Sequence, residues 1–247
     1  MQSTTNKGYI VGVDVGGTFT DVVLADESMN RIWTLKTPST LNDQSLGFIE
    51  GIQQIAHTAG VSAPELVRLF HGTTVATNAI LQKAEPRIGL ITTQGFRDGF
   101  EIGRHDVPRR TDVWGWVKPK RPVPPRLIVE VSERVGVEGE VLTPLDEESC
   151  RTAVRQLRDQ GVQGIAVSFL YSFLMPDHEQ KAAAIIAQEY PGAFISLSSE
   201  VLPQFREFER TAATILNAMV MPYVSQYVDR IETRLKDHNI DAPLLIM

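Results

Sequence analysis

The chain has 247 residues, 43% of them hydrophobic, and its 30 acidic and 24 basic residues give a formal net charge of −6. This length suffices for one large or two modest domains. The acidic balance argues against nucleic acid or an anionic membrane as the main partner, and no apolar run is long enough to span a bilayer. The polar N-terminus and the single cysteine, Cys150, indicate a reducing, cytoplasmic setting.

The first elements are predicted to be strands. Two short β-branched runs, 9–13 and 22–25, flank a segment with two glycines, which indicates a hairpin. A third strand over 31–37 closes a meander. A helix with apolar residues at helical spacing follows, with Asp43 or Ser45 as its N-cap.

The tip of this hairpin is a candidate phosphate site. Gly16 and Gly17 let the backbone approach a ligand and direct N–H groups at it. Thr18 and Thr20 add hydroxyl donors. The segment is not a Walker loop, because no Gly-Lys-Ser/Thr follows and no helix begins here.

Two aspartates flank the tip. If the turn covers 16–19, Asp14 faces Asp21 across the hairpin; if it covers only 16–17, Asp21 lies diagonally on the same face. Like charges on one face destabilise a strand pair, and a bound Mg²⁺ would remove that penalty. The alternative is a plain glycine hairpin with solvated aspartates.

A second candidate anion site follows a strand over 67–70 and opens a helix over 75–81. Thr73, Thr74, Thr77 and Asn78 can place hydroxyl and amide groups beside the unpaired N–H groups of a helix start. The alternative is simple N-capping by Thr73 or Thr74. His71 is either a satisfied buried histidine or a polar group that faces substrate. With a strand over 88–92, the first hundred residues predict a mixed sheet with helices on it.

Residues 104–126 differ from their surroundings. They contain five prolines, seven Arg or Lys residues and two tryptophans. Long irregular segments of this kind are usually functional or disordered. We expect a mobile or partner-facing loop that affects substrate choice; the alternative is a solvated basic loop.

A second α/β unit is predicted after this loop. Its expected elements are a strand over 127–131, a turn over 136–139, a helix over 146–159 capped by Asp146 or Thr143, a strand over 164–170, a helix over 176–189 and a strand over 193–197. Cys150 is expected to be structural.

The last segment is predicted to be helical from residue 209 onward. Pro222 falls inside it and should kink the helix or start a second one. The sequence closes on an apolar strand over 243–247, and we expect the natural polypeptide or its working assembly to continue. Near the helix start, Glu207, Glu209 and Arg210 are interpreted as ordinary ion pairs, as are Glu101 and Arg104.

Several segments together resemble the N-terminal region of the hydantoinase A / 5-oxoprolinase family, which also includes acetone- and acetophenone-carboxylase subunits. The match runs from residue 9 almost to the last residue, and the first two segments in this order are the most specific. The segments are 13–21, 71–79, 92–98, 101–104, 142–146, 196–203, 207–211 and 242–247.

The resemblance implies an α/β fold: the N-terminal half of an actin-like (ribonuclease H-like) ATPase, plus a second βαβ unit and a long C-terminal helix. It implies ATP and Mg²⁺, with 14–21 as a phosphate loop, Asp14 and Asp21 as metal ligands, and both with His71 as catalytic candidates. The domains implied are 8–200, with the loop 104–126 inserted, and 201–247, the helix and first strand of a following core domain.

The function implied is the nucleotide-binding portion of an ATP-dependent amidohydrolase. Such an enzyme opens a cyclic amide of the hydantoin, N-methylhydantoin or 5-oxoproline type through a phosphorylated intermediate. The alternatives are a subunit of an ATP-dependent ketone carboxylase, a small-molecule kinase, and a non-catalytic half that binds a partner. The expected partners are a hydantoinase B-type subunit and further copies of the chain.

Overall fold

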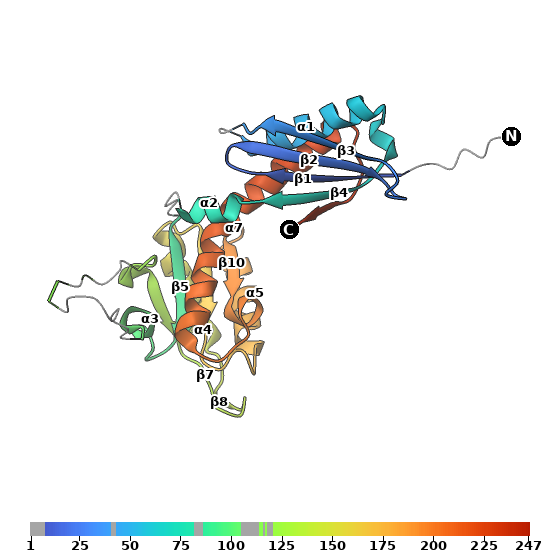
Figure 1. The fold of residues 1–247 in the computed structure, drawn as a ribbon. Coiled ribbons are helices and arrows are strands. Elements are labelled where there is room, and N and C mark those ends of the chain that lie inside the picture. Colours follow the sequence, from blue (N-terminus) through green and yellow to red (C-terminus); the bar gives the residue numbers. More distant parts are fainter. Residues whose placement is uncertain (1–7, 41–42, 82–85, 105–113, 116, 118–120) are drawn as a thin grey trace. The chain divides into compact units, whose positions relative to one another are not determined.

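The computed structural model describes residues 8–40, 43–81, 86–104, 114–115, 117 and 121–247. The chain divides into two compact units (Figure 1): unit 1 is Met1–Gln82 with Tyr223–Met247, and unit 2 is Lys83–Pro222. Unit 1 is therefore built from both ends of the chain, and unit 2 from one continuous segment. This division does not coincide with the boundary that we expected near residue 200.

Unit 1 contains a five-stranded mixed sheet in the order β11-β4-β1-β2-β3. The first three strands form the predicted antiparallel meander. Its first strand pairs in parallel with β4, and β4 pairs in parallel with β11. The strands are β1 (Tyr9–Val15), β2 (Phe19–Asp26), β3 (Ile32–Pro38), β4 (Leu66–Thr73) and β11 (Leu244–Ile246).

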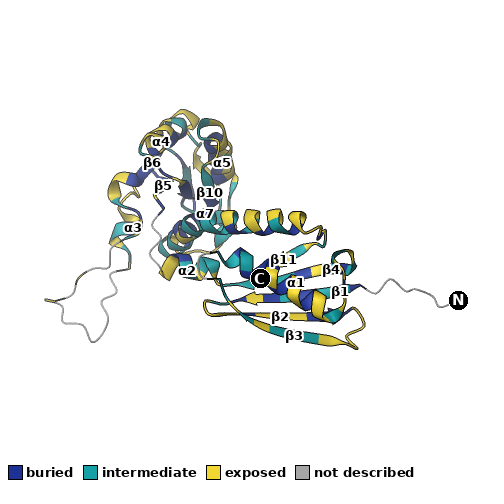
Figure 2. Cartoon of the chain, turned by 90° about the horizontal axis from the view of Figure 1, so that it is seen from above, coloured by how far each residue is buried: buried dark blue, intermediate teal, exposed yellow. Residues whose placement is uncertain are grey.

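One face of this sheet packs on helix α1 (Gln44–Ala59). Side chains alternate between the two faces of a strand, so Val13 and Val15 of β1 are buried while Asp14 between them is exposed. The alternation along β3 is visible in Figure 2 as yellow and teal stretches. A side chain at Gly51 of α1 would stand 2.7 Å from Val22, so glycine there permits the close approach of helix and sheet.

Asp43 caps α1 by accepting a hydrogen bond from the Ser45 N–H at 3.1 Å, which selects it from the two predicted caps. Arg234 donates to the same carboxylate at 2.7 Å. Burial alone would raise the pKa of Asp43, but the hydrogen bonds from Ser45 and Arg234 outweigh it and leave that pKa below its ordinary value. This end of α1 is thereby tied to the last third of the chain.

The helix that supplies Arg234 is α7 (Glu207–Asp237), which has 31 residues and passes through Pro222 without a second helix starting there. Of the two alternatives expected at Pro222, a kink or a second helix, the second helix does not occur. A proline has no N–H to donate within the helix, so one helical hydrogen bond is missing at this point. Pro222 is also the last residue of unit 2. The remaining short elements of unit 1 are η1 (Ala63–Glu65) and α2 (Val75–Leu81).

Unit 2 contains a four-stranded sheet in the order β10-β9-β5-β6, with every neighbouring pair parallel. Parallel sheets are covered on both faces and read as continuous apolar runs. Accordingly, all residues of the two central strands, β5 and β9, are buried. The strands are β5 (Ile88–Thr93), β6 (Ile128–Val131), β9 (Gly164–Ser168) and β10 (Phe194–Leu197).

Helices and a small hairpin complete unit 2. Asp146 caps α4 through the N–H groups of Glu148 and Ser149, which selects it over Thr143. Cys150 is fully buried, and burial raises the pKa of its thiol to about 11, as expected of a structural cysteine. The elements are α3 (Gly99–Ile102), η2 (Pro125–Leu127), β7 (Arg134–Val135), β8 (Val141–Thr143), α4 (Glu147–Asp159), α5 (Asp177–Glu189) and α6 (Ser198–Val201).

Most of the loop 104–126 lies outside the described residues, so its expected role in substrate choice stays a prediction. Where this loop is described, Trp114 is exposed and Val123 is buried. In the described ranges no helix combines the length and the apolar character that crossing a membrane requires.

Candidate functional site

The predicted hairpin has one of its two possible registers. Asp14 pairs directly with Asp21, and Val15 with Thr20. The Gly16 N–H donates to the Phe19 carbonyl at 3.1 Å, so the turn covers 16–19. Directly opposed residues on antiparallel strands project to the same face. Both carboxylates therefore lie on the exposed face of the unit 1 sheet, opposite the face that α1 covers.

Lys36 on β3 neutralises one of these two carboxylates. Its Nζ lies 2.8 Å and 2.9 Å from the two oxygens of Asp21. β2 and β3 pair Asp21 with Lys36, so the contact follows from strand register. Sequence reasoning missed Lys36, although counting back from the turn between these strands could have found it. The Lys36 ammonium group offsets the repulsion between the two carboxylates, which a bound Mg²⁺ was expected to remove.

Asp14 has a different environment. Among the described residues its carboxylate has no hydrogen-bond or ion-pair partner. It pairs across the parallel strands with Gly72 of β4, where a Cβ would stand 3.2 Å from its Oδ1. The absent side chain leaves room for the carboxylate and for a ligand beside it. A carboxylate in such a position suits a hard cation such as Mg²⁺.

A cation at Asp14 would need further oxygen ligands. No group of three or more His, Cys, Asp or Glu residues that could hold a metal occurs within the described part of the chain. Mg²⁺ commonly keeps several waters and binds through one or two carboxylates plus substrate phosphates. Asp14, with Asp21 beside it, fits that pattern of ligands.

The two candidate anion sites come together in the structure. Val15 pairs with Thr73, so the glycine turn and the start of α2 emerge at the same end of adjacent strands. Thr73 Oγ1 accepts from the Val75 N–H at 3.3 Å, which is the capping role left open above. The Asn78 amide donates to Thr74 Oγ1 at 3.2 Å. Thr77 is exposed on the same helix.

The hairpin threonines differ from each other. Thr18 is exposed at the tip, where its carbonyl accepts from the Ser39 N–H at 2.9 Å. Thr20 is fully buried on the α1 side, and its hydroxyl lies 3.0 Å from the Ser39 hydroxyl. The structure thus does not bring the Thr20 hydroxyl to the face that carries Asp14.

His71 is fully buried in unit 1. Its Nδ1 lies 3.1 Å from the Val13 carbonyl, which can only accept, so Nδ1 carries the proton. Its Nε2 then accepts from the Tyr227 hydroxyl at 2.8 Å. Burial lowers the pKa of His71, although the Val13 contact and the nearby Asp14 charge act in the other direction. Both ring nitrogens are occupied, which is the geometry of a satisfied buried histidine, and neither is available to a substrate proton.

Unit 2 carries buried polar groups where its parallel strands end. The Thr93 hydroxyl donates to the Glu133 carboxylate, whose other oxygen lies 2.8 Å from His178 Nδ1. All three residues are buried. Nothing in the sequence indicated that they would meet, because they follow or lie on three different elements.

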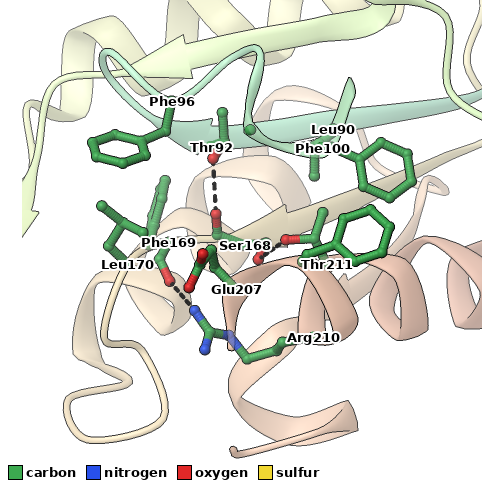
Figure 3. Close-up of a pocket in the computed structure, with 12 residues that line it drawn as sticks. Leu90, Thr92, Phe96, Phe100, Ser168, Phe169, Leu170, Glu207, Arg210 and Thr211 are labelled. Atoms are coloured by element: carbon green, nitrogen blue, oxygen red, sulfur yellow. Dashed lines mark hydrogen bonds between the residues drawn. The ribbon is translucent and has the colours of Figure 1, made fainter. Parts of the chain in front are cut away.

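Arg210 is the largest buried polar group of unit 2, with 1% of its surface exposed. Its guanidinium donates to the Ser198 hydroxyl at 3.1 Å, to the Gln204 carbonyl at 2.8 Å and to the Phe169 carbonyl at 2.9 Å. Figure 3 shows it directed at Phe169. The interpretation of Arg210 as a surface ion pair was wrong. Burial lowers the pKa of Arg210, against the charges of Glu179 and Glu207.

Glu179 belongs to this network, and Glu209 forms an ion pair of its own. Glu179 is fully buried and accepts from Ser198 Oγ at 2.6 Å and from the Phe169 N–H at 2.9 Å. Glu209 forms a two-bond ion pair with Arg104, with one of the two contacts at 2.6 Å. Three of the segments that carry the family resemblance, 101–104, 196–203 and 207–211, are therefore in contact with one another through these side chains.

The mixed sheet of unit 1, in which an antiparallel meander continues into parallel strands, is the N-terminal half of an actin-like ATPase fold. A model of the hydantoinase/oxoprolinase N-terminal region matches residues 10–190, and the chain belongs to this family.

Named relatives agree with this assignment. The chain is 35% identical over 97% of its length to the caprolactamase subunit alpha of Pseudomonas jessenii, of which it covers 35%. It is 38% identical over 88% of its length to the acetophenone carboxylase gamma subunit of Aromatoleum aromaticum, of which it covers 32%. The crystal structure of the ATP-dependent caprolactamase from Pseudomonas jessenii superposes with a TM-score of 0.83 at 33% identity, covering 96% of this chain and 35% of that one.

The chain thus spans about a third of the length of the curated relatives it matches. Both relatives are named as subunits of larger enzymes.

Proposed function

We propose that this chain is the nucleotide-binding portion of an ATP-dependent amidohydrolase that opens a cyclic amide. The observation that carries the proposal is the similarity, over nearly the whole chain, to an enzyme described as an ATP-dependent caprolactamase. A lactam of the hydantoin, N-methylhydantoin or 5-oxoproline type is the proposed substrate class.

The proposed nucleotide site is the end of the unit 1 sheet where the glycine turn and the start of α2 meet. Gly16, Gly17 and Thr18 would offer N–H and hydroxyl donors to phosphate oxygens. Asp14 would hold Mg²⁺, with Asp21 beside it. The end of β4 and the start of α2 add the polar groups of Thr73, Thr74, Thr77 and Asn78.

The chemistry explains why an amidohydrolase would need ATP. An amide resists attack by water, and ATP when bound would supply the phosphoryl group that turns the amide oxygen into a leaving group. The protein's contribution to such a reaction is mainly positioning and neutralisation of charge. An exposed Asp14 that has no partner among the described residues, next to flexible glycine N–H groups, suits that task, whereas His71 is proposed to hold β4, β1 and α7 together.

A ketone carboxylase is the second candidate. It is favoured by the 38% identity to the acetophenone carboxylase gamma subunit. Both candidates would consume ATP, but only the carboxylase would require bicarbonate. A small-molecule kinase would instead leave phosphate on its product.

The test is phosphate release by the complete enzyme on a panel of lactams and ketones, with and without bicarbonate. Lactam-dependent release of phosphate together with a ring-opened amino acid supports the proposal. Turnover that requires bicarbonate identifies the carboxylase. A phosphorylated product identifies the kinase. Titration of the 247-residue chain with Mg-ATP measures nucleotide binding separately.

We further propose that the enzyme works as an assembly in the cytoplasm. The relatives named as subunits support a hydantoinase B-type partner and further copies of this chain. Residues 201–247 would lead into a following core domain that completes the site. Co-purification of the complete enzyme with its neighbouring subunit tests this arrangement.

A further inference from the structure

Unit 2 contains a pocket that the proposed function does not use. Its volume is about 420 Å³. It lies beyond the carboxyl ends of β5 and β9, where Phe96 and Tyr171 follow the two strands, and beside the first turn of α7. The carboxyl edge of a parallel sheet is where open α/β folds bind their ligands. It adjoins the smaller cavity of Figure 3, which shares Phe96, Leu170, Glu207 and Arg210 with it.

The lining of this pocket is basic. Among the described residues, Arg134 and Arg206 have no carboxylate within ion-pairing distance. Glu207 is the acidic residue of the lining, while Glu209 offsets Arg104 and the buried Glu179 offsets Arg210 from outside it. Positive charge therefore remains in excess, which favours an anion. Four arginines contribute their guanidinium groups to this lining: Arg104, Arg134, Arg206 and Arg210.

Aromatic rings hold three of these guanidinium groups. The guanidinium carbon of Arg134 lies 4.9 Å from the centre of the Phe96 ring. The corresponding distance from Arg206 to Phe205 is 5.3 Å. Arg210 is placed in the same way by Phe173, at 5.4 Å. A stacked guanidinium keeps its N–H edge available for two parallel bonds to a carboxylate or phosphate.

The backbone of the pocket is strained at two positions. Tyr171 and Arg206 have φ values of 57° and 75°, and they are two of the four non-glycine residues with positive φ in the described chain. Residues held in such conformations cluster at ligand sites, where the surrounding structure maintains them. Here the strain places one ring and one guanidinium at the pocket wall.

We propose that this pocket binds a small organic oxyanion: a carboxylate or phosphate group attached to a flat apolar body. Arg134 and Arg206 would hold the anionic group, and Phe96 and Tyr171 would contact the body. Arg210, which is buried and already has three hydrogen bonds, would form the floor. The site lies within unit 2 and is independent of the nucleotide site proposed for unit 1.

Calorimetric titration of the 247-residue chain tests the proposal with four probes: benzoate, phenyl phosphate, benzamide and inorganic phosphate. We expect benzoate or phenyl phosphate to bind and the neutral, isosteric benzamide not to bind. Which of the two anions binds more tightly identifies the anionic group. The proposal is overturned if neither aryl anion binds, if benzamide binds equally well, or if inorganic phosphate alone binds.

Variants locate the binding. Arg134→Gln and Arg206→Gln should each weaken the binding of the aryl anion about tenfold or more, as loss of a charged hydrogen bond does. Arg126→Gln, an exposed arginine of the same unit outside the pocket, is the matched control. Affinities equal to wild type in both pocket variants would overturn the assignment.

Arg206→Gly separates binding from folding. Glycine is unstrained at positive φ, so this variant should melt at the wild-type temperature or above it while its affinity for the aryl anion falls. A purely structural arginine would instead show a lowered melting temperature with unchanged affinity, and that result would also overturn the proposal.

Discussion

Asp14 and Gly72 occupy paired positions on adjacent parallel strands, and the carboxylate of Asp14 stands where a side chain at position 72 would press against it. Because glycine has no side chain, the carboxylate of Asp14 has room to take this position. This relationship connects the two segments that made the family resemblance specific, and it turns the proposed nucleotide site into a set of separable predictions.

Gly72→Ala should impair ATP-dependent turnover without loss of stability. The added Cβ would stand 3.2 Å from Asp14 Oδ1, so the carboxylate must move by a few tenths of an ångström. Alanine also restricts the unfolded chain, which stabilises by about 0.4–1 kcal/mol where the native backbone accepts it. Gly12→Ala, where a Cβ would meet nothing within 4 Å, is the control. Equal activity of the two variants would contradict the prediction.

Asp14→Ala should abolish turnover of the complete enzyme and leave the fold intact, because the side chain is exposed and has no partner among the described residues. Loss of a metal-positioning group removes several kcal/mol of transition-state stabilisation. Asp21→Ala breaks only the exposed Lys36 pair, worth about 0–1 kcal/mol of stability, and should retain more activity. Steady-state kinetics and thermal melts of both variants decide. Full activity in Asp14→Ala would refute the site.

Thr74→Val and Asn78→Ala should impair nucleotide handling more than stability. Each removes the same hydrogen bond between the two side chains, so their stability effects should not add. If the pair serves only the helix, each variant should lose about 1 kcal/mol of stability with unchanged kinetics. Chemical denaturation beside nucleotide titration of the two single variants and the double variant distinguishes these outcomes.

The stability of unit 1 should fall as the pH drops below about 6.5. Burial lowers the pKa of His71 in the folded chain, so the unfolded chain binds the proton more readily. The stability that the neutral His71 contributes is therefore complete above the pKa of the unfolded chain. It is lost as the pH falls towards the lower pKa of the folded chain. His71→Gln should flatten this part of the profile, and the exposed His57→Gln should not. Urea denaturation between pH 5 and pH 8 measures the slopes.

Arg210→Met should destabilise unit 2 strongly. The substitution removes a buried guanidinium and its three hydrogen bonds. The carbonyls of Phe169 and Gln204 then lose their donor, and the Glu179 carboxylate loses its nearby positive charge. Removing one member of a buried charged network typically costs about 3–5 kcal/mol. Arg126→Met, an exposed arginine, should change stability by less than about 0.5 kcal/mol. A loss below about 1 kcal/mol for Arg210→Met would contradict the structural role given to Arg210.

The elements followed from local patterns, and the environments of single residues did not. Hydrophobic periodicity located the meander, the longer strands and the longer helices, because burial of one face leaves a period in the sequence. It did not show which sheet a strand joins: β5 was expected in the mixed sheet of the first hundred residues, but it pairs with β6 and β9 in unit 2. Asp43 and Asp146 were each one of two possible caps, since the choice depends on backbone geometry that the sequence does not contain.

The contacts that decide the site depend on register and on distance along the chain. Lys36 reaches Asp21 only in one pairing of β2 with β3. His71 meets Tyr227, 156 residues away, and no local pattern connects them. The buried Arg210 resembled a surface charge, because its sequence neighbours are charged and its acceptors are mostly carbonyls of other elements.

The split composition of unit 1 determines the order in which the chain can fold during synthesis. Domains usually fold as they leave the ribosome, N-terminal first. Here the meander and β4 emerge early, but β11 and the half of α7 that supplies Tyr227 and Arg234 come only after all of unit 2. Unit 2 can therefore fold first. During that time the edge of β4 has no β11 to pair with, and Nε2 of His71 has no Tyr227 hydroxyl, because both segments are still untranslated.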